Sequence, residues 1–428
     1  MAVINFIATQ IIGNPGILFG LITLLGMLLL KKSFPDILMG VVKTVIGYLI
    51  LVLGCGPLQS ACTPVGGWIN DLLGVQGIVP QNWIIMSEAT TRFGSQVGLA
   101  VLVGFVVNLL LARFTKLKNV ALTGQILVIW ASWAVGVLVA YPRANFITVV
   151  LVAGVFCGIY NWLASAISYH FMKKSGRMTD EFSLYVTEIT GIALTCWLSP
   201  VVGNKDKRCD DMEVPESLEW LRDTTVSVSV IATIIWTIIG LIAGPARVAA
   251  YSGGQNWIIY LIFLGLNFGM GLTVVLFGVR MMLAEIVPAF KGISTRLIKG
   301  AIPGLDYPTV FQFAPMAVFI GFLSNLAGGI LATFVMTFSG LPVVVLPAVW
   351  MNFWTGGTLG VFADAYGGRR ACIIVNLVLG FLAPFGWALA YPSSGIFSMI
   401  NATNDYTDTG TIGLLYQWVV KLVFGGNA

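Results

Sequence analysis

The chain is dominated by a succession of long apolar segments, which restricts the folds open to it. Most of these segments are long enough to cross the ~30 Å hydrocarbon core of a bilayer as helices. They lie near residues 13–30, 41–57, 97–112, 119–140, 146–170, 226–246, 256–284, 310–338, 341–363, 371–391 and 411–424. Two stretches, 83–94 and 180–200, are shorter or more polar, and we expect re-entrant or interfacial helices there. The sequence predicts an all-α polytopic membrane protein with about ten or eleven transmembrane helices, some of them broken.

The composition agrees with this fold class. Of the 428 residues, 57% are hydrophobic and only 10% are charged, whereas soluble globular proteins carry ~25% charged residues. The many glycines and prolines sit mostly inside the apolar runs, as in bundles where small residues let helices approach closely. A transmembrane barrel would instead show alternating segments of ~10 residues. An ordinary soluble enzyme and an outer-membrane barrel are therefore both excluded.

The basic residues are interpreted as signals of membrane topology, and not as a nucleic-acid surface. The histidine and cysteine content gives no indication of a metal centre. The net charge of +5 comes largely from basic clusters in short loops, which mark cytoplasmic sides. The chain has one histidine, His170, and its six cysteines show no CxxC spacing, so we expect no metal and no cofactor. The N-terminal stretch lacks a basic region ahead of its apolar run, and no cleavable signal peptide is expected.

A charged stretch near the middle of the chain suggests a division into two halves. Residues 203–225 contain most of the soluble-looking sequence, and we expect a linker between 1–202 and 226–428. A docking surface for a soluble partner is the alternative for this stretch. The two halves also share a weak sequence similarity: the spacing of Pro35, Lys43 and Gly47 recurs as Pro288, Arg296 and Gly300. This similarity predicts an internal two-fold repeat, which could be parallel or inverted.

The segment Asp306-Tyr307-Pro308-Thr309 interrupts an apolar region with an acid and a proline. Both are expensive in hydrocarbon and usually line a polar cavity. Transporters commonly build solute sites at such broken segments near the bilayer midplane. An ionised Asp306 would accept hydrogen bonds from solute hydroxyls, although a loop acid at the membrane interface is the alternative. At nearly the same offset in the first half lies the broken stretch that contains Gly56 and Gln59, which we include in the predicted site.

Three other groups of residues are candidates for the same site. Glu88 and Arg92 are four apart and would form an ion pair on a helix, so Glu88 and Thr90 either line a cavity or belong to a structural pair. Thr187 and Glu188 precede an apolar stretch, and a buried Glu188 would need a partner or a ligand. Gln125 is a lone amide in an apolar run.

The sequence contains no motif for catalysis or nucleotide hydrolysis. There is no GxxxxGK[ST] loop, which excludes an ATP-driven pump, and no GxSxG or HExxH element. No nucleophile is paired with a base in an evident motif. The chain is therefore expected to transport a solute without a catalytic site of its own.

The second half resembles a known family. The stretch FGVRMMLAEIVPAFKGISTRLIKGAIPGLDYPTVFQFAPMAVFIGF and the later GVFADAYGGRRA resemble the ascorbate-type membrane component, component C, of the bacterial sugar phosphotransferase system. LLLKKSFPDILMGVVKTVIGYLILVLGCG, NLLLARFTKLKNVALTG and FSLYVTEITG follow the same family order in the first half. The chain departs from the family at Gln125, where ascorbate members carry a histidine, and at Tyr185 to Glu188, where they carry a histidine and glutamines.

The resemblance implies a homodimeric permease in the bacterial inner membrane, with a scaffold domain and a mobile substrate-carrying core. Its small-molecule substrate is ascorbate or a related sugar or polyol, which a soluble B component, charged by an A component, phosphorylates. Asp306 matches the acid of the family motif. The alternative from another class is an ion- or proton-coupled symporter in which Asp306, Glu88 or Glu188 binds the coupling cation, and a sensor without transport is a third hypothesis.

Overall fold

The computed structural model describes residues 14–211 and 223–425 of the chain. The fold is almost entirely helical, with three short strands, and the prediction of an all-α membrane protein is confirmed. In chain order the elements are α2 (Pro15–Leu29), α3 (Phe34–Leu73), α4 (Asn82–Phe114), β1 (Asn119–Ala121), α5 (Gly124–Leu138), α6 (Phe146–Ser175), β2 (Ser183–Leu184), α7 (Ile189–Val202), α8 (Thr224–Ala243), α9 (Pro245–Tyr251), α10 (Trp257–Arg296), β3 (Ile302–Leu305), α11 (Pro308–Phe311), α12 (Pro315–Met336), α13 (Val349–Ala390), the 3-10 turns η3 (Tyr391–Ser393), η4 (Gly395–Ile400) and η5 (Thr407–Gly410), and α14 (Ile412–Phe424).

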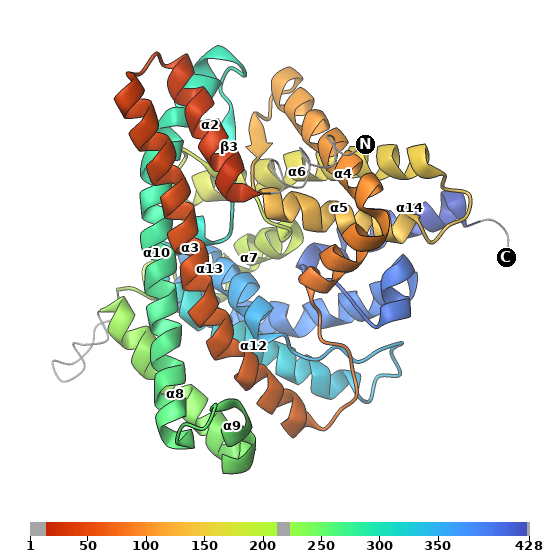
Figure 1. Cartoon of the computed structure of the whole chain (residues 1–428). Coiled ribbons are helices and arrows are strands. Elements are labelled where there is room, and N and C mark those ends of the chain that lie inside the picture. Colours follow the sequence, from red (N-terminus) through yellow and green to blue (C-terminus); the bar gives the residue numbers. More distant parts are fainter. Residues whose placement is uncertain (1–13, 212–222, 426–428) are drawn as a thin grey trace.

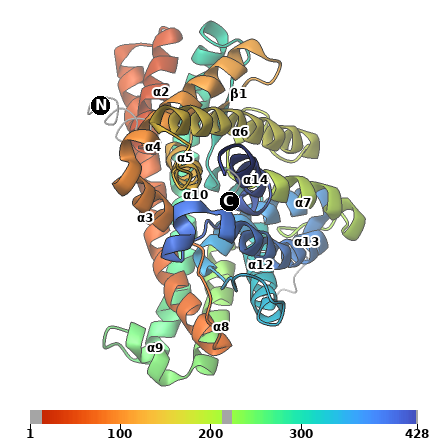
Figure 2. The same ribbon diagram turned by 90° about the vertical axis from the view of Figure 1, so that its right-hand side faces the viewer.

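Two 40-residue helices, α3 and α10, run side by side along one side of the molecule. Glycines let their backbones touch: a Cβ atom added at Gly54 would lie 2.6 Å from the backbone nitrogen of Val275, and one added at Gly47 would lie 2.6 Å from that of Met282. Small residues at helix crossings are how membrane helices gain close packing. Both views place α2 near one end of the molecule and α8 with α9 near the other (Figure 1 and Figure 2).

Seven of the described helices are long and apolar enough to cross a membrane: α3, α4, α6, α8, α10, α12 and α13. The remaining apolar helices α2, α5, α7 and α14 have 13 to 15 residues, fewer than the ~20 that a simple span requires. The described residues thus hold fewer simple spans than the expected ten or eleven, because apolarity alone does not distinguish a span from a short helix buried in the protein.

Several expected segment boundaries differ for an identifiable reason. The segments expected at 83–94 and 97–112 form one helix, α4, which is kinked at Phe93 (φ −130°, ψ 30°). Those expected at 341–363 and 371–391 form one helix, α13, which is interrupted at Gly368 (φ 65°, ψ −167°). The segment expected at 119–140 divides into strand β1 and helix α5. The sequence predicted broken helices, and the structure has them, but the breaks in α4 and α13 lie inside helices that were expected to be two separate segments.

The three strands form a parallel sheet with the order β1-β3-β2. Each strand follows a charged segment, and contacts join these segments: the guanidinium of Arg113, in the last turn of α4, donates to the carbonyl of Leu297 at 2.7 Å, and the ammonium of Lys291, near the end of α10, lies 3.6 Å from a carboxylate oxygen of Glu181. The basic loops of both halves thus meet at one end of the protein. The positive-inside rule predicts that this end is cytoplasmic, and all three strands run inward from it.

The expected linker, 203–225, is only partly described, because residues 212–222 lie outside the described ranges. Its first part is packed against α13. The backbone N–H of Asn204 donates to the carbonyl of Gly367 at 2.7 Å, and Arg208 pairs with the fully buried Asp364 at 2.9 Å. The division into two halves and the internal repeat stay predictions.

Candidate functional site

The small sheet brings together candidate residues from three distant parts of the chain. Because the carboxyl ends of parallel strands meet at one edge, the residues that follow β1, β2 and β3 become neighbours. Gln125 follows β1, Thr187 and Glu188 follow β2, and Asp306 with Tyr307 follows β3 directly. At ~3.3 Å per strand residue, the strands carry these side chains inward from the basic end. The hydrogen bond between Tyr307 and Glu188 joins the residues that follow β3 and β2, and Gln125 lies in the first turn of α5, shortly after β1.

Asp306 occupies the junction between β3 and the single turn α11. One carboxylate oxygen, Oδ1, accepts a hydrogen bond from the N–H of Tyr307 at 2.7 Å. Within the described ranges Oδ2 has no hydrogen-bond partner, and the side chain is only partly buried. Burial nevertheless raises the pKa of Asp306 to about 6, against the lowering effect of the Tyr307 N–H. The carboxyl group thus has one oxygen free to accept a hydrogen bond from a solute.

Glu188 is fully buried and is surrounded by hydrogen-bond donors from three other elements. One oxygen accepts from the hydroxyl of Thr355 at 2.8 Å and from the phenol of Tyr307 at 3.2 Å. The other accepts from the backbone N–H of Thr407 at 3.3 Å and from the Thr407 hydroxyl. Burial raises the pKa of Glu188 to about 8, although the Thr407 hydrogen bonds oppose the rise. Glu188 ties β2, β3, α13 and η5 together around the site.

The structure adds two carboxylates that sequence reasoning missed, Asp405 and Asp408. Asp408 caps α7: its carboxylate accepts from the N–H groups of Ile189 at 2.6 Å and Thr190 at 2.9 Å, and also from the phenol of Tyr160. Asp405 is 1% exposed, and only one of its oxygens accepts a hydrogen bond, from the N–H of Asn82 at 3.3 Å. The signal was present in the polar run from 401 to 410, which carries two acids between apolar segments.

A buried phenol, that of Tyr406, lies next to Asp405 in the chain and is hydrogen-bonded to Asn82. The Tyr406 hydroxyl accepts a hydrogen bond from the Asn82 amide at 3.1 Å. Burial, followed by the nearby Asp405, Asp306 and Glu188, raises the pKa of Tyr406 well above its ordinary value. Asn82 joins this phenol to Asp405, because its backbone N–H donates to the Asp405 carboxylate, and the charges of Asp306 and Glu188 also act on the phenol.

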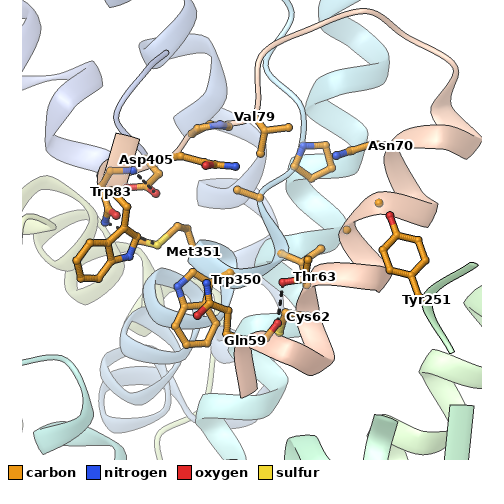
Figure 3. Close-up of a pocket in the computed structure, with 18 residues that line it drawn as sticks. Gln59, Cys62, Thr63, Asn70, Val79, Trp83, Tyr251, Trp350, Met351 and Asp405 are labelled. Atoms are coloured by element: carbon orange, nitrogen blue, oxygen red, sulfur yellow. Dashed lines mark hydrogen bonds between the residues drawn. The ribbon is translucent and has the colours of Figure 1, made fainter. Parts of the chain in front are cut away.

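A cavity of about 430 Å³ opens beside this cluster (Figure 3). Gln59, Thr63 and Asn70 line it from the C-terminal part of α3, and Asn82 and Asp405 line it from the other side. In Figure 3, Asp405 and Trp83 lie at one end, and Tyr251 and Asn70 at the other. The full lining is Gln59, Cys62, Thr63, Gly66, Gly67, Asn70, Val79, Pro80, Gln81, Asn82, Trp83, Tyr251, Pro347, Ala348, Val349, Trp350, Met351 and Asp405.

The cavity lies away from the basic end. Helix α3 begins beside Lys32, and Gln59 is 16 residues beyond the Lys43–Glu285 ion pair, which corresponds to ~24 Å of helix. A second cavity of about 20 Å³ shares Asp405 with the large one and is also lined by Thr355. The Thr355 hydroxyl also donates to Glu188, so one lining residue of the small cavity contacts the cluster at the inner strand ends.

The remaining predicted residues divide into two groups. A Cβ atom added at Gly56 would meet nothing within 4 Å, so Gly56 borders open space, and Gln59 lines the large cavity. Glu88 forms an ion pair with Arg92 on the same helix at 2.5 Å, and the Thr90 hydroxyl donates to the carbonyl of Met86 at 2.7 Å. Neither Glu88 nor Thr90 is among the residues that line the described cavities. The ion pair of the structural interpretation is thus present, and a cavity-lining role for Glu88 and Thr90 stays a prediction.

Comparisons with known proteins agree with the geometry. A family model described as "PTS system sugar-specific permease component", EIIC-GAT, matches residues 10–408. The chain is 26% identical, over 422 aligned residues, to the "Ascorbate-specific PTS system EIIC component" of Mycoplasma pneumoniae (strain ATCC 29342 / M129 / Subtype 1). The alignment covers 86% of this chain and 64% of that relative, so the chain spans just under two thirds of the relative's length. The family match gives no support to an ion- or proton-coupled symporter. With its seven span-capable helices, the chain belongs to the sugar-specific permease components of the bacterial phosphotransferase system, as a multi-pass protein of the inner membrane.

Proposed function

We propose that this protein carries ascorbate or a related sugar or polyol across the inner membrane, so that a soluble B component can phosphorylate it. One observation carries the proposal. Asp306, Glu188 and Tyr307 lie at the inner ends of strands that enter from the basic end, while the large cavity approaches the same cluster from the other end. A solute site within reach of both sides is what alternating access requires.

The proposed site residues have distinct roles. Asp306 and Gln125 contact the solute, Gly56 leaves room for it beside α3, and Gln59 lines its entry. Thr187, Glu188 and Tyr307 hold the strand ends in register, because Tyr307 and Glu188 are hydrogen-bonded across two loops. The chain supplies no catalytic group, and the phosphoryl transfer belongs to the soluble components B and A of the complex.

The partners follow from the same arrangement. The basic loops at the strand-bearing end are the proposed docking face for component B, since that end is expected to be cytoplasmic. We also propose a homodimer, supported by the family resemblance. Large apolar side chains remain exposed on α3, including Leu49 (57%) and Leu53 (69%), and these face either lipid or a second copy of the chain.

The test is uptake of labelled solute by membrane vesicles that contain the protein with components A and B. Uptake should require phosphoenolpyruvate and should be lost in Asp306→Asn, which keeps the side-chain shape but removes the charge. Asp71→Asn is the matched control, because Asp71 is exposed near the C-terminal end of α3, away from the basic end, and does not line the large cavity, so its substitution should leave uptake unchanged. Uptake driven by a sodium or proton gradient without phosphoenolpyruvate would contradict the proposal.

A further inference from the structure

The groups around the large cavity determine which chemical class of solute fits it. Among the residues that the structure describes, no lysine, arginine or histidine lines the cavity. Its polar lining consists of amides, hydroxyls and the carboxylate of Asp405. The buried acids of the cluster have no cationic partner in the described ion pairs, which join other residues. A solute in this cavity therefore meets one carboxyl group, that of Asp405, and no compensating base.

Two deeply buried side chains at the end of the cavity still need a hydrogen-bond donor. Oδ1 of Asp405, at 1% exposure, and Oδ1 of Asn82, at 3%, have no hydrogen-bond partner in the described part of the chain. Both atoms are acceptors, since the Asn82 NH₂ group already donates to Tyr406. A buried acceptor without a donor costs free energy, so the two atoms favour a ligand that brings hydroxyl groups.

The neighbouring groups complete a surface suited to a sugar or polyol. Trp83 and Trp350 line the same cavity and offer apolar ring faces to the C–H groups of such a molecule. The N-terminus of α7 is not available to an anionic ligand, because the Asp408 carboxylate already occupies it.

We propose that Asp405 and Asn82 form a subsite for adjacent hydroxyl groups of a neutral polyhydroxylated solute, and that the cavity selects against anions such as the ascorbate monoanion. The inference rests on the proposed function and narrows its substrate class. An anion beside Asp405 would repel the ionised form of this carboxyl group, which has no base next to it, whereas a neutral polyol can donate hydroxyl groups to the free oxygens of Asp405 and Asn82 without adding a charge. Asp405 is thus a specificity-determining residue.

The experiment compares ligands that differ only in charge. Binding of a hexitol and of the aldonate with the same carbon skeleton is measured on the purified full-length protein in detergent, with ascorbate as a third ligand. We expect the hexitol to bind at least about tenfold more tightly than the aldonate or ascorbate. Asp405→Asn should weaken hexitol binding and narrow this ratio, whereas Asp180→Asn should change neither.

A second variant keeps the inference testable if Asp405→Asn does not fold. Gln59 is exposed at the cavity, so Gln59→Arg adds a cation without disturbing a buried group and should improve aldonate binding relative to hexitol at least fivefold. Tighter binding of ascorbate or the aldonate to the unmodified protein, or no binding of any neutral polyol, would overturn the inference. If phosphoenolpyruvate-dependent ascorbate uptake accompanied either result, the proposed function would stand and only the substrate class would fall. Hexitol binding without any phosphoenolpyruvate-dependent uptake would support the substrate class and overturn the proposed function.

Discussion

Replacing Glu188 with glutamine should change how the stability of the protein depends on pH. Glu188 is fully buried, and its carboxyl group receives hydrogen bonds from Tyr307, Thr355 and Thr407. No base contacts it in the described part of the chain. Burial raises its pKa in the folded protein to about 8, from an ordinary value of 4.5. Glutamine has the same shape and resembles the protonated acid, but it has no proton to lose.

The sign and size of the effect follow from proton linkage. Between pH 4.5 and 8 the folded protein holds a proton on Glu188 that the unfolded chain has released. The contribution of Glu188 to the free energy of unfolding therefore falls as pH rises, by up to about 1.4 kcal/mol per pH unit. Over three pH units the wild type should lose on the order of 4 kcal/mol relative to Glu188→Gln, because all other titrating groups are shared by the two proteins.

The assay is thermal or denaturant unfolding of both proteins in one detergent at pH 5, 6.5 and 8. The variant should be close to the wild type in stability at pH 5 and more stable than it at pH 8. Glu181→Gln is the control, since Glu181 is exposed beside Lys291 and its substitution should give a nearly pH-independent difference. If Glu188→Gln were instead less stable at pH 8, the four donors would be holding an ionised carboxylate, and the reasoning from burial would be wrong.

Three further substitutions test the packing around the site. Gly54→Ala should lower the free energy of unfolding by about 1–3 kcal/mol, because its Cβ would lie 2.6 Å from a backbone nitrogen of α10, whereas Gly56→Ala should leave it unchanged; equal melting temperatures would refute the close approach. Asp408→Asn leaves one acceptor oxygen for the N-terminus of α7 and should cost about 1–3 kcal/mol, with faster amide hydrogen exchange in the first turn of α7 as the readout; unchanged exchange would contradict the capping role. Arg208→Ala removes the cationic partner of the buried Asp364 and should lower the free energy of unfolding by about 3–5 kcal/mol. Adding Asp364→Ala should recover part of this stability in thermal unfolding. A double variant that is less stable than Arg208→Ala would count against the buried pair.

Features that depend on residues close together in the chain could be predicted from the sequence. A run of apolar residues must leave water whatever its neighbours are, so the membrane class and most helices followed from the sequence. Asp306 and Glu188 could be identified in the same way, because an acid inside an apolar segment needs a cavity or a partner. The pair of Glu88 and Arg92 was also visible, since residues four apart meet on one helix face. The structure shows this ion pair, and a role for Glu88 in lining a cavity stays a prediction.

Contacts between distant residues decided the rest. The sequence does not show that β1, β2 and β3 pair, because strands of two to four residues have no periodic signal of their own and are fixed by partners more than 100 residues away. That pairing is what brings the segments that carry Gln125, Glu188 and Asp306 to one edge of the sheet. The donors that surround Glu188 come from α13 and η5, at Thr355 and Thr407, which no spacing rule connects.

Asp405 and Asp408 show most clearly what the sequence determines and what only the tertiary structure decides. The order of residues alone establishes that two carboxylates lie in a polar run between apolar segments. Folding then gives them different roles. The Asp408 carboxylate accepts hydrogen bonds from the first N–H groups of α7, while one oxygen of Asp405, beside the cavity, has no hydrogen-bond partner in the described part of the chain. The roles diverge because a side chain's hydrogen-bond partners depend on which backbone groups packing leaves unpaired next to it, and packing is a property of the whole chain.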